Sequence, residues 1–139
     1  MIIHHKFLEN ENLLVQKAFG EWSTEYYIKY IDEVFKQKEM LNVKKIFSDL
    51  RDINLEKAFK DLDLLIALRN KMIKLDYLSV VLIDNPMSTT VTHLYQERVI
   101  SEGYDHTYCS TMKKAFSLLS LNMSENEMED ILNKIERPS

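Results

Sequence analysis

The one cysteine of the chain, Cys109, stands where a reactive thiol could be placed. It ends an expected strand at the start of an expected helix, and Lys113 and Lys114 follow in the first turn of that helix. Positive charge of this kind lowers the pKa of a thiol and favours the nucleophilic thiolate. A strand cysteine is, however, commonly buried as a small apolar residue, and no base is evident nearby in the sequence. We therefore favour burial of Cys109 over a thiol-dependent activity.

Two strand-to-helix junctions carry polar side chains that could hold a small anion, because the amides of a helix N-terminus attract negative charge. The candidate residues are Asn85, Ser88, Thr89, Cys109, Ser110 and Lys113. The alternative, which we favour for the first junction, is purely geometric. Pro86 ends the strand, and Ser88 or Thr89 caps the helix that follows.

The sequence offers no pattern for a metal or a nucleotide cofactor. His4 and His5 are neighbours in an expected edge strand, so their side chains point to opposite faces and cannot share a metal ion. Two glycines in the whole chain leave no glycine-rich loop to cradle phosphates. We expect no metal and no cofactor, while a metal site assembled from distant segments stays open.

The composition is that of an ordered, soluble protein. The 139 residues are 45% hydrophobic and 29% charged, which suffices for one core of ordinary size. The net charge of −4, with no cluster of basic and aromatic residues, argues against nucleic-acid binding. The opening lacks the features of a signal peptide, and the longest apolar run, residues 78–83, is too short to span a membrane. One cysteine excludes an internal disulfide, and we expect a cytoplasmic protein of bacterial type.

The hydrophobic periodicity predicts alternating strands and helices. Ser23 is the expected cap of the first helix and Asn54 that of the second. The expected strands are 2–8, 13–19, 43–49, 78–83 and 106–109; the expected helices are 23–40, one after Asn54, 88–101, one from Ser110 or Thr111, and 124–136. A short polar connection joins the first two strands as in an antiparallel hairpin, and helical crossovers suit parallel neighbours. This order predicts an α/β fold with a mostly parallel sheet.

Three aromatic residues of the first helix, Trp22, Tyr26 and Tyr30, repeat every four positions beside its apolar stripe. They could form an exposed ridge for a protein partner. We favour the alternative that they widen the face that packs on the core.

Three segments at strand ends carry a resemblance to a known family. They are residues 47–51 (Phe-Ser-Asp-Leu-Arg), residues 84–89 (Asp-Asn-Pro-Met-Ser-Thr) leading to 95–98, and residues 109–111 (Cys-Ser-Thr) before 115–119. With the order of elements, they resemble the STAS superfamily, the sulphate transporter and anti-sigma factor antagonist domain, in its stand-alone SpoIIAA-like branch. The resemblance covers residues 1–121. It implies a singly wound sheet of about five strands with crossover helices and an antiparallel edge strand.

The resemblance also implies protein-protein regulation through the loop after the third strand. The implied partner-binding residues are Asp49, Arg51, Asp52 and Asn54, and we expect the first three to be accessible to solvent. In anti-sigma antagonists an aspartate in this loop is followed directly by a phosphorylatable serine. Here Leu50 follows Asp49, so the sequence does not predict a phosphorylation switch at this place.

Residues 122–139 lie beyond the region of resemblance and contain an amphipathic helix. Ser124 and Glu127 match a capping box, and an apolar stripe follows at Met128, Ile131, Leu132 and Ile135. A stripe of this kind has to be covered. It packs either on its own domain, which we favour slightly, or against a second copy in a homodimer.

The sequence thus favours a non-enzymatic, cytoplasmic STAS-like regulator with a protein partner of unknown identity. The alternative is a carrier of the same fold for a small lipid-like or anionic ligand. An enzyme that depends on Cys109 is the least favoured of the three.

Overall fold

Five strands form one sheet in which neighbours in the sequence are also neighbours in space, in the order β1-β2-β3-β4-β5. The computed structural model describes residues 1–72, 77–103 and 105–135. β1 pairs with β2 in antiparallel orientation, and the other three pairs are parallel. The strands are β1 (Ile2–Leu8), β2 (Leu13–Glu21), β3 (Lys45–Asn54), β4 (Leu78–Leu82) and β5 (Asp105–Cys109). The expected α/β fold with a mostly parallel sheet and an antiparallel edge is therefore confirmed.

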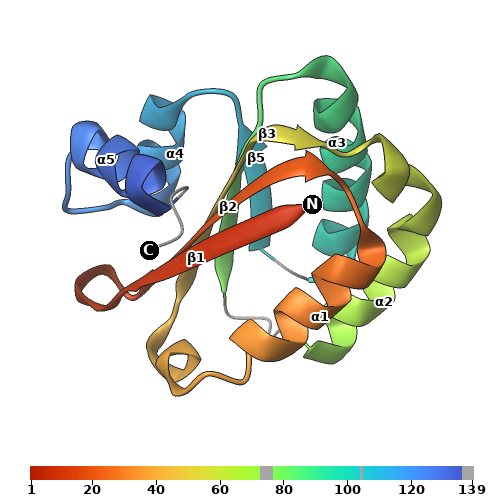
Figure 1. Cartoon of the computed structure of the whole chain (residues 1–139), viewed down its shortest axis with the longest axis horizontal. Coiled ribbons are helices and arrows are strands. Elements are labelled where there is room, and N and C mark those ends of the chain that lie inside the picture. The colour runs from red at the N-terminus through yellow and green to blue at the C-terminus, as the bar shows by residue number, and fades with distance from the viewer. Residues whose placement is uncertain (73–76, 104, 136–139) are drawn as a thin grey trace.

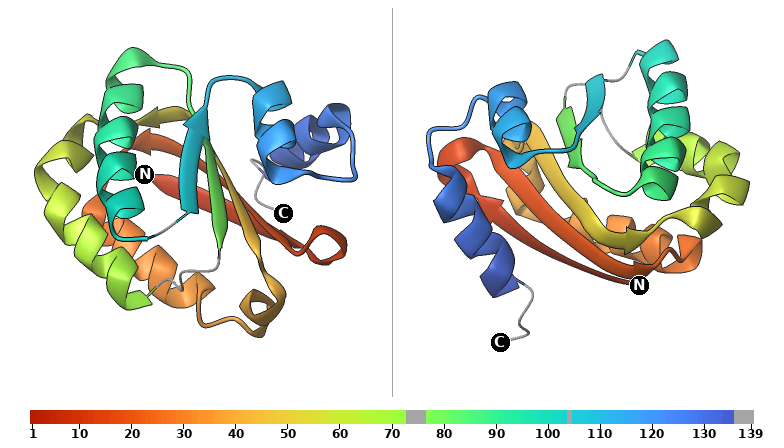
Figure 2. Two further views of the ribbon diagram at one scale, coloured as in Figure 1. Left: turned by 180° about the vertical axis from the view of Figure 1, so that it is seen from behind. Right: turned by 90° about the horizontal axis from the view of Figure 1, so that it is seen from above.

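Helices cover both faces of this sheet (Figures 1 and 2). Three of them, which form the crossovers between the parallel strands, lie on one face, and the last two lie on the other. The α-helices are α1 (Thr24–Val34), α2 (Leu62–Met72), α3 (Pro86–Ser101), α4 (Met112–Leu119) and α5 (Glu125–Ile135). Short 3-10 helices are η1 (Glu9–Glu11), η2 (Lys38–Asn42) and η3 (Glu56–Asp61). Along the described chain, no helix combines the length and the apolar character needed to cross a membrane.

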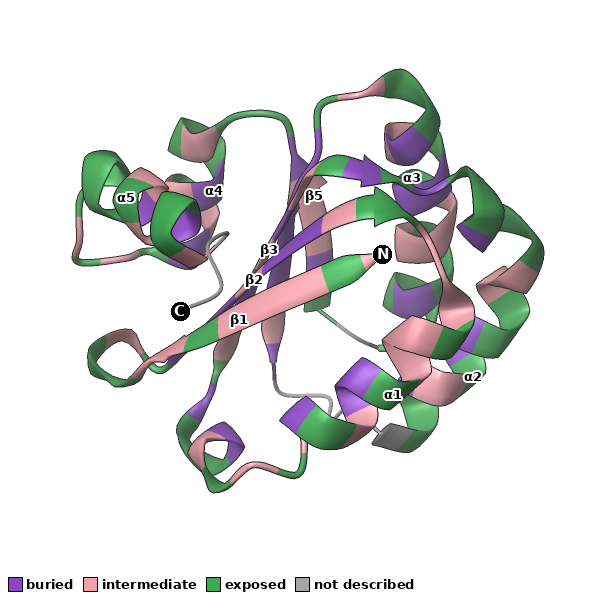
Figure 3. Cartoon of the chain, in the orientation of Figure 1, coloured by how far each residue is buried: buried purple, intermediate pink, exposed green. Residues whose placement is uncertain are grey.

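The alternation of side chains along the strands places buried residues on both faces of the sheet. Buried residues lie in the strands and in the helices on either side of them (Figure 3). In β2, Leu13 and Val15 face α4 and α5, while Leu14 faces α1. The same alternation places Phe47 of β3 and Val80 of β4 in the core under α4 and α5. The central strands therefore contribute alternate residues to the two faces, as pleated strands covered on both sides do.

The third strand is longer than the sequence indicated. The expected strand ended at Asp49, whereas β3 continues to Asn54 because β2 pairs with it as far as Glu21. The register between the two strands shifts between Lys17 and Phe19, a β-bulge that bends the pair. The polar segment 51–54, expected as a loop, is therefore the end of a strand.

Three helix boundaries also differ from expectation. Asn54 does not cap the second helix, because η3 follows it and α2 begins only at Leu62. The first helix is capped by Ser23 as predicted, but it ends at Val34 and η2 occupies the following turn, where a helix to residue 40 was expected. Helix α3 begins at Pro86, and proline suits this first helical position because the backbone N–H there makes no bond within the helix. The cap is Asn85, whose side chain accepts a hydrogen bond from Ser88 N. Neither Ser88 nor Thr89 is the cap, so that expectation was wrong.

The terminal helix α5 packs on its own domain. Its capping box is formed, since Ser124 Oγ accepts from Glu127 N and the Glu127 carboxylate accepts from Ser124 N. Met128 and Leu132 are fully buried in the core of the α4 and α5 face. These two side chains of α5 thus pack internally, in line with the favoured alternative, and the homodimer stays a prediction; residues 136–139 of the expected segment lie outside the described residues.

Candidate functional site

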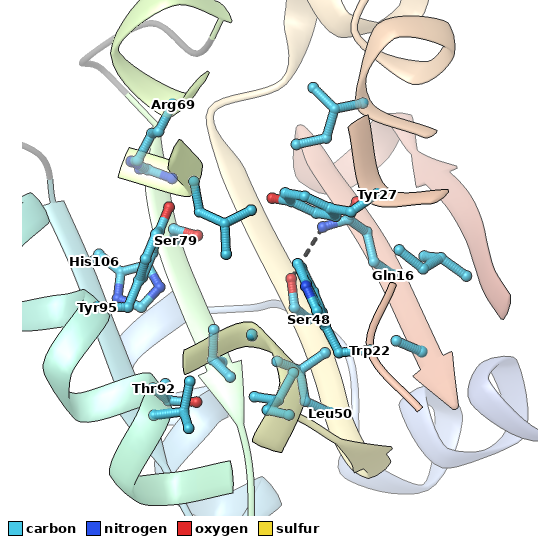
Figure 4. A pocket seen from close by; sticks show the side chains of 18 of the residues that line it. Gln16, Trp22, Tyr27, Ser48, Leu50, Arg69, Ser79, Thr92, Tyr95 and His106 are labelled. Carbon is cyan, nitrogen blue, oxygen red and sulfur yellow. Dashed lines mark hydrogen bonds between the residues drawn. The ribbon is translucent and has the colours of Figure 1, made fainter. Parts of the chain in front are cut away.

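A pocket of about 140 Å³ lies between the sheet and the crossover helices α1, α2 and α3 (Figure 4). Every strand contributes at least one side chain to it, and so do the three helices and η3. Most of the lining is apolar, for example Ile31 of α1, Leu65 of α2 and Val91 of α3. The pocket therefore lies in the core between the sheet and helices α1 to α3, where close packing would otherwise be expected.

The strands supply the pocket with a line of polar side chains. Successive parallel strands present Gln16, Ser48, Ser79 and His106 toward the pocket. Gln16 is the register partner of Ser48, and Ser79 is the register partner of His106, so the four form two neighbouring pairs. Each of these residues interrupts a strand that is otherwise mainly apolar on this face.

The first pair is joined by hydrogen bonds within the protein. Tyr30 donates its hydroxyl to the Gln16 side-chain oxygen at 2.6 Å, and Gln16 Nε2 donates to Ser48 Oγ at 3.0 Å (Figure 4). Burial raises the pKa of Tyr30 far above its usual value, so its hydroxyl keeps the proton that it donates. The Gln16 side of the pocket is thus held in place by α1.

The second pair lies beside the most polar corner of the pocket. Arg69, near the end of α2, and His106 of β5 are each only 5% exposed. The His106 ring packs edge-on against Tyr95 of α3, with ring centroids 5.3 Å apart. Burial, and next the charge of Arg69, lower the pKa of His106 to about 3, so the ring is neutral near pH 7. Within the described part of the chain, His106 Nδ1 is buried and has no hydrogen-bond partner.

The opposite end of the pocket is aromatic. Trp22 and Tyr27 pack against each other with ring centroids 4.8 Å apart, and the Trp22 indole N–H donates to Thr24 Oγ1. Trp22, Tyr26 and Tyr30 do not form an exposed ridge, because Tyr30 is buried and the other two are half-buried against the core clusters. The favoured interpretation, that they widen the core face, is confirmed.

The partner-binding residues expected after the third strand are not all on the surface. Asp49 is fully buried on the α5 side of the sheet, so its expected accessibility was wrong. Its carboxylate accepts hydrogen bonds from the backbone N, Nε and Nη2 of Arg51, and Lys17 Nζ lies 3.6 Å away. These bonds raise the pKa of Arg51 further above its already high value. Asp52 is exposed as expected and Asn54 is exposed too, and their role in partner binding stays a prediction.

The residues proposed for an anion loop mostly have structural tasks. Ser88 is buried; its hydroxyl accepts from Leu55 N and donates to the Ile53 carbonyl, which ties α3 to the end of β3. Thr89 donates to the Asn85 carbonyl. These bonds support the geometric interpretation of the junction 84–86. Ser110 and Lys113 are exposed at the other junction, where Thr111 caps α4.

Cys109 is buried, as favoured from the sequence. Burial raises the pKa of its thiol, and this outweighs a backbone hydrogen bond with Thr111 and the charge of Lys114, which act in the opposite direction. The lowered pKa considered for a reactive thiol is therefore not found.

A metal centre is not suggested by the described residues, among which no three histidine, cysteine or acidic side chains are close enough to hold an ion. His4 and His5 lie on the edge strand β1, where His4 contacts Phe19 and His5 contacts Tyr30.

The pocket was missed in the sequence because its lining comes from nine separate elements and connecting segments. A signal was nevertheless present: each of four strands places one polar side chain on the face that α1, α2 and α3 cover, namely Gln16, Ser48, Ser79 and His106. Arg69 gave a further signal, because it falls among the apolar positions of its helix together with Leu65 and Ile66.

A comparison of the chain with protein-family models, with curated proteins and with solved structures finds no match in any of the three.

Proposed function

We propose that this protein binds a small, mainly apolar molecule in the pocket between the sheet and helices α1 to α3. The observation that carries the proposal is the pocket itself, which combines a largely apolar lining with a few polar side chains gathered in one corner. Ligand sites of proteins commonly have this constitution, because apolar contacts supply affinity and a few polar groups fix orientation.

The size of the pocket limits the ligand. At about 140 Å³ it is close to the engineered cavity of about 150 Å³ that binds benzene in another protein. A single ring or a short alkyl chain fits this volume, whereas a membrane lipid with long acyl chains does not. The ligand is therefore a small molecule and not a phospholipid.

The polar side chains argue that the space is more than imperfect packing. Dry voids in protein cores are lined by apolar residues, whereas this pocket contains the buried side chains of Arg69 and His106. Burial of polar and charged groups costs free energy. Ligand binding would explain why polar side chains are buried here in spite of this cost.

A STAS-like regulatory role is our second candidate, and it is supported by the exposure of Asp52 and Asn54 at the end of β3. It ranks lower because Asp49 and Arg51, which the resemblance assigns to the same surface, bond to each other, with Asp49 buried. A stable protein complex that Asp52→Lys weakens, while the melting temperature changes by at most a few degrees, would favour this role.

Fluorescence of Trp22 provides a direct test of ligand binding, because it is the one tryptophan of the chain and it lines the pocket. We expect benzyl alcohol to change this fluorescence in a saturable manner and to raise the melting temperature. Val91→Phe should abolish both effects, since Val91 lines the pocket and the larger ring fills it.

Ile100→Phe is the matched control, because it makes a similar change on an exposed part of the same helix. The proposal fails if a panel of single-ring and short-chain compounds neither changes the fluorescence nor stabilises the protein. It also fails if Val91→Phe, while folded, binds them as well as Ile100→Phe does. Native mass spectrometry of the purified protein would add support if it shows a bound molecule in stoichiometric amount.

A further inference from the structure

We infer that the bound molecule is a small monocarboxylate, such as an aromatic or short-chain acid, whose acid group lies against Arg69 and His106. This inference rests on the proposed function and names its ligand class. The argument uses the charge, the hydrogen-bonding groups and the size of the pocket.

Arg69 gives the pocket its positive charge. Its side chain enters from α2 and is 5% exposed, and it lies in the same corner as Ser79, Tyr95 and His106 (Figure 4). A guanidinium group has five N–H donors in a planar fork, and this geometry suits the two oxygens of a carboxylate. With five donors it can hold a ligand carboxylate in addition to contacts within the protein.

The charges of the remaining lining favour an anion over a cation or a zwitterion. None of the lining side chains in the described chain is acidic. A ligand ammonium group would therefore have no carboxylate to pair with, and it would lie near the guanidinium of Arg69. The burial of an unpaired charge of either sign is strongly unfavourable. The acid group of a ligand has a partner in this pocket, and a basic group has none.

His106 adds a hydrogen bond without adding a second charge. The His106 side chain is buried, with 5% of the residue exposed, and its Nδ1 has no hydrogen-bond partner among the described residues. A neutral imidazole still carries one N–H, which can donate to a carboxylate oxygen. One guanidinium and one neutral ring suit a single negative charge better than the two charges of a phosphate monoester or a dicarboxylate.

The apolar remainder of the pocket selects the body of the ligand. From the polar corner the lining continues through Leu65 and Val91 to Trp22 and Tyr27. These side chains match a phenyl ring or a short alkyl chain, and the volume of about 140 Å³ admits one such group. Benzoate and hexanoate are therefore suitable probes.

Benzoate and benzamide provide the sharpest test on the wild-type protein, because they have nearly the same shape and differ in charge. We expect calorimetry at pH 7 to show that benzoate binds about tenfold or more tightly than benzamide, since charge-assisted hydrogen bonds are stronger than neutral ones. Hexanoate should likewise bind more tightly than hexanamide. If the amides bind as tightly as the acids, this inference is wrong and the proposed function stands; if neither series binds, both are wrong.

Arg69→Met tests the position of the acid group, because it removes the charge and keeps much of the length of the side chain. The preference for benzoate should be lost in this variant. Lys71→Met is the matched control, since Lys71 is an exposed cation on the same helix, and the preference should be retained. An unchanged preference in folded Arg69→Met would place the anion elsewhere and overturn the inference.

The imidazole of His106 gives a readout that does not depend on a variant. A carboxylate that accepts a hydrogen bond from the ring changes its surroundings, so bound benzoate should shift the side-chain NMR signals of His106 at pH 7 more than bound benzamide does. If saturating benzoate leaves these signals unchanged, the acid group does not lie beside the ring and the inference fails.

Discussion

Replacement of Asp49 by alanine is expected to lower the free energy of unfolding by about 3 kcal/mol, because it removes the centre of a buried ion cluster. Asp49 is fully buried and accepts three hydrogen bonds from Arg51 at 3.1, 2.9 and 2.9 Å. Its carboxylate also lies 3.6 Å from Lys17 Nζ, and the Lys17 side chain is only 6% exposed.

The size of this loss depends on which acidic partners Lys17 and Arg51 keep after Asp49 is removed. Removal of one partner from a buried ion pair typically costs about 3–5 kcal/mol, since the other charge is left without compensation. Here Lys17 keeps Asp52 at 3.5 Å and Arg51 keeps Glu129 at 3.3 Å, so we expect the lower end of this range. For a chain of this length, such a loss corresponds to a fall of about 12 °C in melting temperature.

Urea unfolding followed by far-UV circular dichroism measures the change, and Asp52→Ala is the matched control. Asp52 contacts the same lysine, but its side chain is 59% exposed, so its removal should cost about 1 kcal/mol or less. A loss below about 1 kcal/mol for Asp49→Ala would refute the argument that this cluster is structural. Equal losses in the two variants would refute the importance of burial.

Three further predictions concern buried residues in other parts of the fold. Leu132→Ala in α5 should lower the free energy of unfolding, measured in urea, by about 3 kcal/mol because Leu132 is fully buried. Ile131→Ala should lower it clearly less because Ile131 is only half-buried, and equal losses would contradict the docking of α5. The low pKa of His106, about 3, means that the unfolded chain binds the proton more readily, so stability should fall as the pH drops from about 6.5 toward 3, by up to about 1.4 kcal/mol per unit. His106→Gln should have a shallower acid slope than wild type, and identical slopes would show that the ring is not neutral in the fold. Cys109 should react with iodoacetamide at pH 7.5 at least about tenfold more slowly in the native than in the urea-unfolded protein, and equal rates would contradict its burial.

Most of the fold could be predicted because periodicity and junction residues determine it locally. Alternating apolar residues in the strands, the cap at Ser23 and the capping box at Ser124 all indicated their elements from neighbouring residues alone. The extension of β3 to Asn54 could not be predicted in this way. It depends on pairing with β2 across a bulge, and the segment 51–54 has the polar composition of a loop.

The accessibility expected for Asp49 failed for a related reason. In the sequence, a polar segment after an apolar strand looks exposed, but the alternation of the longer strand turns Asp49 toward α5. The cation that compensates it, Arg51, is two residues away on the same strand face, and Lys17 belongs to the neighbouring strand. The pairing therefore depends on the register of β2 and β3, which the sequence does not show.

The buried polar residues on the two faces of the sheet differ in their charges, and this difference supports the location of the site. On the α5 face, Lys17, Asp49 and Arg51 form a cluster in which acids and bases are matched by close contacts. On the α1 to α3 face, the lining contains the cation Arg69 and the neutral ring of His106 but no acidic side chain within the described chain. The corner with a cation and a buried ring nitrogen can gain binding free energy from an added carboxylate. The face that carries the pocket, with no acidic side chain in its described lining, is therefore the face on which a ligand should be sought.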